Sequence, residues 1–235
     1  MASTPALPEA DVAVHRMGEE GEPLVVIDNF SGLTERFLEG GRAATYRPAG
    51  ASYPGLRSPV DPSYLDLRRE LMMQLMGRVF GIRRGIGCEA ASFSLVTLPP
   101  ESLAPLQRIP HHDHDLKGDG SQVIAVMHYL LGPESGGTAF YRHRRTGFET
   151  ITPARFPAFG EALEQDAREY GEPPARYFYG DDERYELIAE VEARPDRLIL
   201  YRGRTLHSGV IPDARALSDD PAKGRLTVNM FLVGS

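Results

Sequence analysis

The sequence predicts a mainly β fold with flanking helices (α+β), of the double-stranded β-helix type, also called a jelly roll or cupin-like fold. Strand-like patterns dominate from residue 86 onward, helical periodicity is confined to a few segments, and the best candidate site residues fall near strand ends. A jelly roll that holds polar groups at the mouth of its barrel can host a small-molecule site. The 235 residues suffice for one well-buried core, so we expect a single domain over residues 1–235.

The first third of the chain is expected to supply an arm, a strand and two helices. Residues 1–22 are largely polar, which predicts a partly ordered N-terminal arm. A strand is predicted at 24–27 and a helix at about 33–40, ended by a Gly-Gly pair. The Asp61-Pro62 pair suits the start of a longer helix, whose wide apolar stripe predicts packing on a sheet. Residues 48–62, rich in Pro, Gly and Ser, are predicted as a loop.

The remainder of the chain alternates between strands and turns, with one interruption. Residues 152–184 break the strand pattern with a predicted helix at 157–170 and an aromatic stretch rich in Gly and Pro. An insertion of this kind is expected to be a lid or substrate wall, or equally a dimer surface. The predicted strands are 86–97, 123–131, 138–141, 185–192, 197–201 and a last segment from Arg225.

The densest group of candidate metal ligands lies between Arg108 and Asp115, where three histidines and two aspartates follow Pro110. On a strand, alternate side chains share one face, so His111 and Asp113 would point the same way. An imidazole and a carboxylate so placed make two-thirds of the facial triad that binds non-haem Fe(II) and leaves coordination positions open.

The best candidate for the second histidine is His207, which follows a clear strand and precedes a glycine and a proline. Eighteen residues later, Arg225 begins a segment that alternates as a strand should, with Arg225, Thr227 and Asn229 on one face. An arginine that projects from a strand beside a metal site suits a carboxylate, because its planar fork can bind both oxygens.

This order of residues resembles the 2-oxoglutarate/Fe(II) oxygenases, and most closely their prolyl 4-hydroxylase-like branch. That branch has Tyr-Leu, then Gly-Gly, Thr and an aromatic residue between its ligands, and residues 128–141 here read HYLLGPESGGTAFY. The resemblance spans roughly residues 90–232, and residues 25–30 look like the first strand of the branch. In one departure, a loop lengthens the gap between His207 and the basic residue and carries a competing Arg215. Arg225 is therefore assigned on its strand context.

The resemblance implies that His111, Asp113 and His207 bind Fe(II). It further implies that 2-oxoglutarate and O₂ act as cosubstrates at this metal. Oxidative decarboxylation would give succinate and CO₂ while an unactivated C–H bond is oxidised, by hydroxylation, desaturation or cyclisation. The histidines must be neutral to ligate a metal, so metal affinity is expected to fall at low pH.

The same resemblance implies that Arg225 binds the far carboxylate of 2-oxoglutarate, helped by Thr227 and Tyr129. The modest size of the chain and its aromatic insertion favour a small amino-acid-like or natural-product substrate. Three arginines are candidates for binding a substrate carboxylate, namely Arg142, Arg144 and Arg202.

Two alternatives stay open. If the strand register slips by one residue, His112 and His114 face the metal, together with Glu134 or His207. That arrangement would suit a cupin-type isomerase or hydrolase that uses Zn²⁺ or Mn²⁺. In the second alternative, the barrel is a non-catalytic module that binds a metal or a ligand.

Composition narrows the range of partners. The net charge of −7 argues against nucleic acid as the main partner. The single cysteine excludes an intrachain disulfide and fits a reducing compartment. Neither a signal peptide nor an apolar run of membrane-spanning length is found, which predicts a cytoplasmic protein without a membrane partner. A homodimer is compatible with the sequence.

Overall fold

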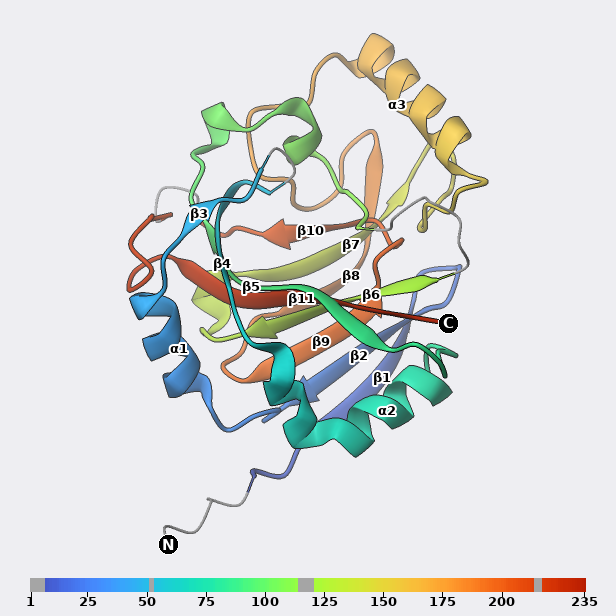
Figure 1. Cartoon of the computed structure of the whole chain (residues 1–235). Helices are drawn as coiled ribbons and strands as arrows, with labels where there is room; N and C mark the ends of the chain where they lie inside the picture. The colour runs from blue at the N-terminus through green and yellow to red at the C-terminus, as the bar shows by residue number, and fades with distance from the viewer. Residues whose placement is uncertain (1–6, 51–52, 114–120, 214–216) are drawn as a thin grey trace, which may run out of the picture.

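The computed structural model describes residues 7–50, 53–113, 121–213 and 217–235, which form two antiparallel sheets flanked by helices (Figure 1). The large sheet has the strand order β1-β2-β9-β6-β11-β5-β4-β3, and the small sheet has the order β10-β7-β8. The strands are β1 (Asp11–Met17), β2 (Glu22–Asp28), β3 (Arg47–Pro48), β4 (Gly55–Pro59), β5 (Gly87–Val96), β6 (Gln122–Tyr129), β7 (Gly137–His143), β8 (Tyr185–Glu192), β9 (Arg197–Arg202), β10 (His207–Val210) and β11 (Arg225–Gly234). The helices are α1 (Thr34–Ala43), α2 (Arg69–Arg78) and α3 (Phe156–Tyr170), with short 3₁₀ turns η1 (Pro62–Arg68), η2 (Pro100–Ser102), η3 (Pro105–Arg108) and η4 (Pro133–Ser135).

The path of the chain confirms the predicted double-stranded β-helix. From β5 onward the chain passes from the large sheet to a bridge between His111 and the small sheet, and back to β6 in the large sheet. It continues through β7 and β8 in the small sheet, β9 in the large, β10 in the small and β11 in the large. This alternation winds two facing sheets around one interior, as in a jelly roll.

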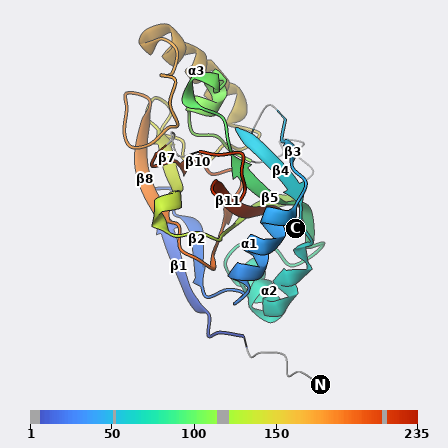
Figure 2. The ribbon, with the colours of Figure 1, turned by 90° about the vertical axis from the view of Figure 1, so that its left-hand side faces the viewer.

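Helices cover the outer face of the large sheet. Figure 2 shows α1 and α2 on one side of this sheet, with the small sheet on the other. The outer core contains buried side chains from both helices and from the strands beneath them, such as Met76, Leu95 and Val228. The predicted helix at Asp61 begins as the 3₁₀ turn η1, where the Asp61 side chain accepts a hydrogen bond from the Ser63 N–H (2.9 Å). No helix within the described ranges has the length and hydropathy needed to cross a bilayer.

Alternate residues of the same strands point into the barrel. There, Tyr129 and Tyr201 of the large sheet pack with Phe140 and Val191, which come from the small sheet. The two faces of each central strand are therefore both covered, which explains the apolar pattern of β6 on both faces.

Two segments differ from the sequence-based expectation. Part of the predicted N-terminal arm forms β1, which pairs with β2 along the edge of the large sheet although Val12 and Val14 stay exposed. Backbone pairing at an edge leaves little trace in the hydrophobic pattern. The predicted loop 48–62 contains β4, which pairs with β5. The helix predicted at 157–170 is confirmed as α3, at the opposite end of the molecule from α2 (Figure 1).

Candidate metal site at the mouth of the barrel

Backbone pairing fixes the segment that carries the His-x-Asp motif. His111 and His207 form an antiparallel bridge, in which each residue donates its N–H to the other's carbonyl (2.9 and 2.8 Å). The Asp113 N–H donates to the Gly203 carbonyl (2.7 Å). The motif thus lies beside β10 as an added piece of strand, and its register is set by hydrogen bonds at both ends.

The three predicted ligands meet at one point. His207 Nε2 lies 3.2 Å from one carboxylate oxygen of Asp113, and His111 Nε2 lies 3.7 Å from the other. Potential ligand atoms of all three residues lie within 4.8 Å of one another. Within the described residues, no other group of three or more His, Cys, Asp or Glu side chains is arranged in this way.

The orientation of His207 is set by a hydrogen bond and by packing. Its Nδ1 lies 2.9 Å from the Thr205 carbonyl, which can only accept, so Nδ1 carries a proton and Nε2 is the nitrogen that would bind a metal after losing any proton it shares with Asp113. The ring packs on Tyr201 (centroids 4.8 Å apart) and Phe140 (6.4 Å). A carbonyl behind a histidine ring is a common support for a metal ligand.

Burial and the charges of the neighbouring ligands shift the pKa of each of the three residues. Desolvation by the surrounding protein, followed by the charge of His207, lowers the pKa of His111 to about 4. Desolvation raises the pKa of Asp113, but the two histidines outweigh it and hold that pKa at about 2. The pKa of His207 is raised because the nearby Asp113 outweighs the effect of burial. Near pH 7, His111 is neutral and Asp113 is ionised, as metal ligation requires.

Arg225, Thr227 and Tyr129 lie together on the inner wall of the large sheet. Thr227 is directly opposite Tyr129 in the register of β11 and β6, and Arg225 shares its face of the strand. Arg225 is buried, and it donates to the carbonyls of Ser135 (2.7 Å) and Gly137 (3.0 Å). The Tyr129 hydroxyl lies 2.6 Å from Thr138 Oγ1, and burial raises the pKa of Tyr129 to about 12.

The three arginines predicted to bind substrate are engaged elsewhere. Arg142 forms ion pairs with Glu149 (2.7 Å) and Glu186 (3.1 Å). Arg144 donates to the Asp182 carbonyl (2.9 Å). Arg202 pairs with Glu22 (2.9 Å), and its guanidinium lies over the ring of Phe80 in the outer core. Arg202 therefore points to the face of the large sheet opposite the triad.

The residues of the alternative register are placed apart from the triad. The His112 ring lies 6.2 Å from that of Phe156, in an edge-on arrangement. Glu134 is exposed on η4. His114 lies outside the described residues, as does Arg215. Within the described part of the chain, the cluster of ligand atoms contains neither His112 nor Glu134.

Sequence reasoning missed two polar residues beside the site, Tyr53 and Arg57. Arg57 lies in β4, directly opposite Ser94 of β5, and Ser94 in turn lies opposite Thr227. Its guanidinium lies 4.4 Å from the centre of the Tyr53 ring. The sequence between Gly55 and Pro59 shows no alternation that would predict a strand.

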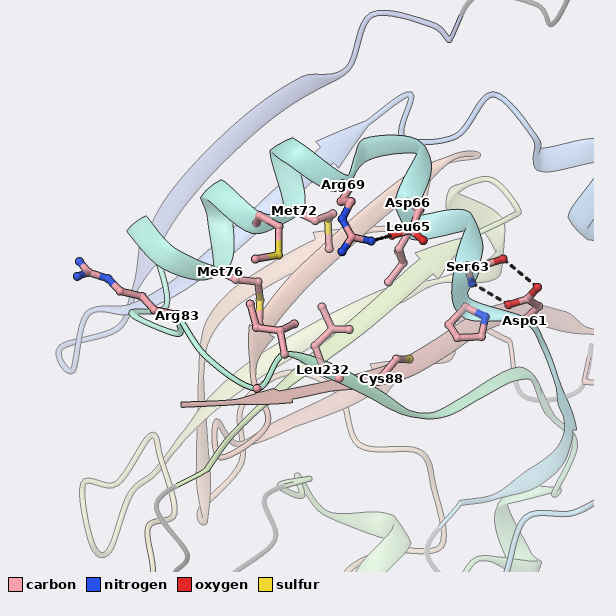
Figure 3. Close-up of a pocket in the computed structure, with 15 residues that line it drawn as sticks. Asp61, Ser63, Leu65, Asp66, Arg69, Met72, Met76, Arg83, Cys88 and Leu232 are labelled. Carbon is pink, nitrogen blue, oxygen red and sulfur yellow. Dashed lines mark hydrogen bonds and ion pairs between the residues drawn. The ribbon is translucent and has the colours of Figure 1, made fainter.

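A separate cavity of about 430 Å³ lies on the outer side of the large sheet, between α2 and the strands β5 and β11 (Figure 3). Its lining includes Met72 and Met76 of α2, with Cys88 and Leu232 from the strands. None of the predicted site residues lines it.

Comparisons with known proteins bear on fold and family. No curated protein sequence matches the chain. Three similar solved structures match 90% of the chain each. HygX from Streptomyces hygroscopicus, with nickel and 2-oxoglutarate bound, is 14% identical over 82% of its own chain, with a TM-score of 0.44. SnoN, a non-haem α-ketoglutarate-dependent epimerase from nogalamycin biosynthesis, is 15% identical over 78% (TM-score 0.46). The viral collagen prolyl hydroxylase vCPH from Paramecium Bursaria Chlorella virus-1, in its 2-oxoglutarate complex, is 11% identical over 96% (TM-score 0.48).

A family model matches residues 8–232, and the chain belongs to that family, DUF6445, a family of unknown function.

Proposed function

We propose that the protein is a non-haem Fe(II)/2-oxoglutarate-dependent oxygenase that oxidises an unactivated C–H bond of a small molecule. The observation that carries the proposal is the convergence of His111, Asp113 and His207 at the mouth of a double-stranded β-helix. Two imidazoles and one carboxylate on one side of a metal leave its remaining positions open, which suits non-haem Fe(II).

The donor set fits this metal. His207 presents Nε2 because Nδ1 is bound to the Thr205 carbonyl, and the Asp113 carboxylate has one oxygen toward each histidine. The low pKa of His111 and of Asp113 keeps both ready to ligate at neutral pH. With 2-oxoglutarate and O₂, the bound iron would supply the oxidising power, and the protein would supply position and surroundings.

Arg225 is the candidate anchor for the far carboxylate of 2-oxoglutarate. Two of its five N–H groups are used by the Ser135 and Gly137 carbonyls, which fix the guanidinium and leave three N–H groups for a ligand. Within the described residues, Arg225 has no carboxylate partner closer than 4.0 Å, so a buried positive charge is without compensation. The hydroxyls of Thr227 and Tyr129 lie beside it and bond Asn229 Oδ1 (2.8 Å) and Thr138 Oγ1 (2.6 Å), so each would exchange this partner for the anion.

The insertion is the candidate wall of the substrate chamber. The Tyr177 hydroxyl donates to the carbonyl of Leu98, two residues after β5 ends (2.7 Å). Arg108, three residues before the triad begins, donates to the Pro173 carbonyl (3.2 Å). These bonds tie the aromatic part of the insertion to the loop that leads into the metal site, which suits the exclusion of water from the reaction.

The first test is an anaerobic titration of the purified protein with Fe(II) and 2-oxoglutarate, followed by the weak visible charge-transfer band. We expect the band to appear with wild type and with His112→Ala, and to be lost with His111→Ala. Loss with His112→Ala and retention with His111→Ala would instead favour the alternative register. Under air, formation of succinate that requires Fe(II) distinguishes an enzyme from a binding module.

A further inference from the structure

Arg57 is a cation in the barrel without an evident partner. It projects from β4 on the face shared by Ser94 and Thr227, and its guanidinium stacks on the ring of Tyr53. Its Nε is buried and makes no hydrogen bond. The buried hydroxyl of Tyr53 faces Ser94, which counteracts the effect of burial on the pKa of Tyr53, but it forms no well-aligned hydrogen bond. A buried N–H donor without an acceptor, such as the Arg57 Nε, is costly unless something else binds it.

The position of this pair links the triad to Arg225. Beyond burial and the effects within the triad, the positive charge of Arg57 also lowers the pKa of both His111 and Asp113. Burial raises the pKa of Tyr53, while the charges of Arg225 and Arg57 act in the opposite direction. Tyr53 therefore lies within electrostatic reach of both arginines, and Arg57 within reach of the triad.

The two arginines on this wall, Arg57 and Arg225, indicate that the site binds a second anion besides 2-oxoglutarate. Neither Arg57 nor Arg225 has a carboxylate within 4.0 Å among the described residues, although other arginines such as Arg142 and Arg197 do. In the proposed function, 2-oxoglutarate brings two carboxylates, one for the metal and one for Arg225. The positive charge of Arg57 is then still without a negatively charged partner, and the aromatic ring of Tyr53 lies beside it.

We propose that Arg57, supported by Tyr53, binds a carboxylate of the substrate and so holds the carbon to be oxidised near the triad. The inference rests on the proposed function and specifies its substrate as an anionic small molecule. The guanidinium would offer its N–H groups to the carboxylate, with the Tyr53 hydroxyl as a further donor. Stacking on the tyrosine ring orients the fork and limits the freedom lost on binding.

The test uses a matched pair of probes, 4-fluorophenylacetate and its neutral amide, followed by ¹⁹F NMR. Each is titrated into the full-length protein without added metal, and again with Fe(II) and 2-oxoglutarate under argon. We expect wild type to bind the carboxylate at least about tenfold more tightly than the amide, the equivalent of one charge-assisted hydrogen bond. Arg57→Gln should remove this preference, Arg57→Lys should keep part of it, and Arg36→Gln, an exposed change on α1, should keep all of it.

A second readout separates substrate from cosubstrate. We expect Arg57→Gln to change the Kd of 2-oxoglutarate, measured by the charge-transfer band, by less than about twofold, and Arg225→Gln to raise it by about tenfold or more. A tenfold weaker 2-oxoglutarate complex in Arg57→Gln would overturn the proposal and assign Arg57 to the cosubstrate. A wild type without preference for the carboxylate probe, or a preference that survives Arg57→Gln, would also overturn it. If wild type fails to form the iron complex at all, the proposed function falls, and the metal-free titration still decides whether Arg57 binds anions.

Discussion

The protein contains two kinds of histidine–aspartate contact, and their surroundings give them different roles. At the mouth of the barrel, Asp113 faces two histidines, and within the described residues no backbone N–H donates to its carboxylate. On the helix-covered side, Asp196 accepts from His128 Nε2 (3.0 Å), from the N–H and hydroxyl of Ser31 and from the Gly32 N–H. A carboxylate saturated by donors is a structural link, whereas one that faces only imidazoles is free to bind a metal.

The His128–Asp196 pair joins distant parts of the chain. Asp196 lies in the turn between β8 and β9, with a positive φ of 62°, and Ser31 precedes α1. His128 is fully buried and stacks on Tyr64 (centroids 5.7 Å apart) in the turn before α2. One carboxylate thus fixes the large sheet to the segments that lead into both of its covering helices.

The largest effect is expected from removal of the saturated carboxylate. Asp196→Ala would leave the buried donors of Ser31 and His128 unpaired, together with the N–H of the exposed Gly32, and should lower the free energy of unfolding by about 3–5 kcal/mol. Urea unfolding of the metal-free protein measures this. The matched change Asp113→Ala removes a carboxylate that is paired with His207 and His111 but with no backbone N–H, and should lower the free energy of unfolding by a smaller amount, about 1–2 kcal/mol. Equal losses in the two variants would erase the distinction.

Metal affinity should show the reverse order. Asp113→Asn keeps the size of the side chain but removes the charge between the two histidines, and we expect Fe(II) affinity to fall by at least about a hundredfold. Anaerobic competition with a chelator measures the change. A control such as Asp166→Asn, which alters the buried contact between Asp166 of α3 and His143 (2.7 Å), should keep its Fe(II) affinity within about threefold. Retention of full affinity by Asp113→Asn would contradict the assignment of this residue as a ligand.

The parts of the fold and of the candidate site that could be predicted from the sequence depend on residues close together in the chain. His111 and Asp113 are two residues apart, so strand alternation alone places them on one face, and the strand before His207 marks the third ligand. The positions of β5, β6, β7, β8, β9, β11 and of the helix α3 were predicted as well, whereas β10 was not.

What the sequence could not predict depends on partners far away in the chain. Arg57 enters the site because β4 pairs with β5, and nothing within five residues of it indicates that pairing. Arg142 looks free in the sequence, yet it pairs with Glu149 and with Glu186, forty-four residues later. The hydrogen bond from Ser31 to the carboxylate of Asp196, 165 residues away, could not be predicted from the sequence either. Backbone pairing and charge compensation are properties of the fold, so they escape a reading of single segments.

A second buried pair allows the comparison to be tested by pH. His143 Nε2 lies 2.7 Å from Asp166 of α3, and its Nδ1 lies 2.9 Å from Thr146 Oγ1. Burial lowers the pKa of His143 by more than Asp166 raises it, so the unfolded chain binds a proton at higher pH than the folded one. Stability from this group is therefore complete above the ordinary histidine pKa of about 6.5, and is lost as pH falls toward the folded pKa.

The expected result is a steeper loss of stability for wild type than for His143→Gln between pH 7.5 and pH 5.5. Glutamine cannot titrate in this range but can still donate to Asp166. Urea unfolding at several pH values measures the difference, and metal-free protein is used so that the triad contributes equally to both proteins. Parallel pH profiles would show that His143 does not titrate differently on folding.

The smallest effect concerns two buried tyrosines that differ in their hydrogen bonds. The Tyr129 hydroxyl bonds Thr138 beside Arg225, whereas the buried hydroxyl of Tyr185 has no hydrogen-bond partner within the described residues. If Tyr129 contributes one neutral hydrogen bond to 2-oxoglutarate, Tyr129→Phe should raise the Kd of 2-oxoglutarate about three- to tenfold. Tyr185→Phe removes an equivalent oxygen from the core near α3, and should leave that Kd unchanged and stability equal or slightly higher. An unchanged Kd in Tyr129→Phe would leave Arg225 and Thr227 as the remaining candidate donors to 2-oxoglutarate. The hydrogen bond of the Tyr129 hydroxyl would then have a structural role only, like the hydrogen bonds of Asp196 and Asp166.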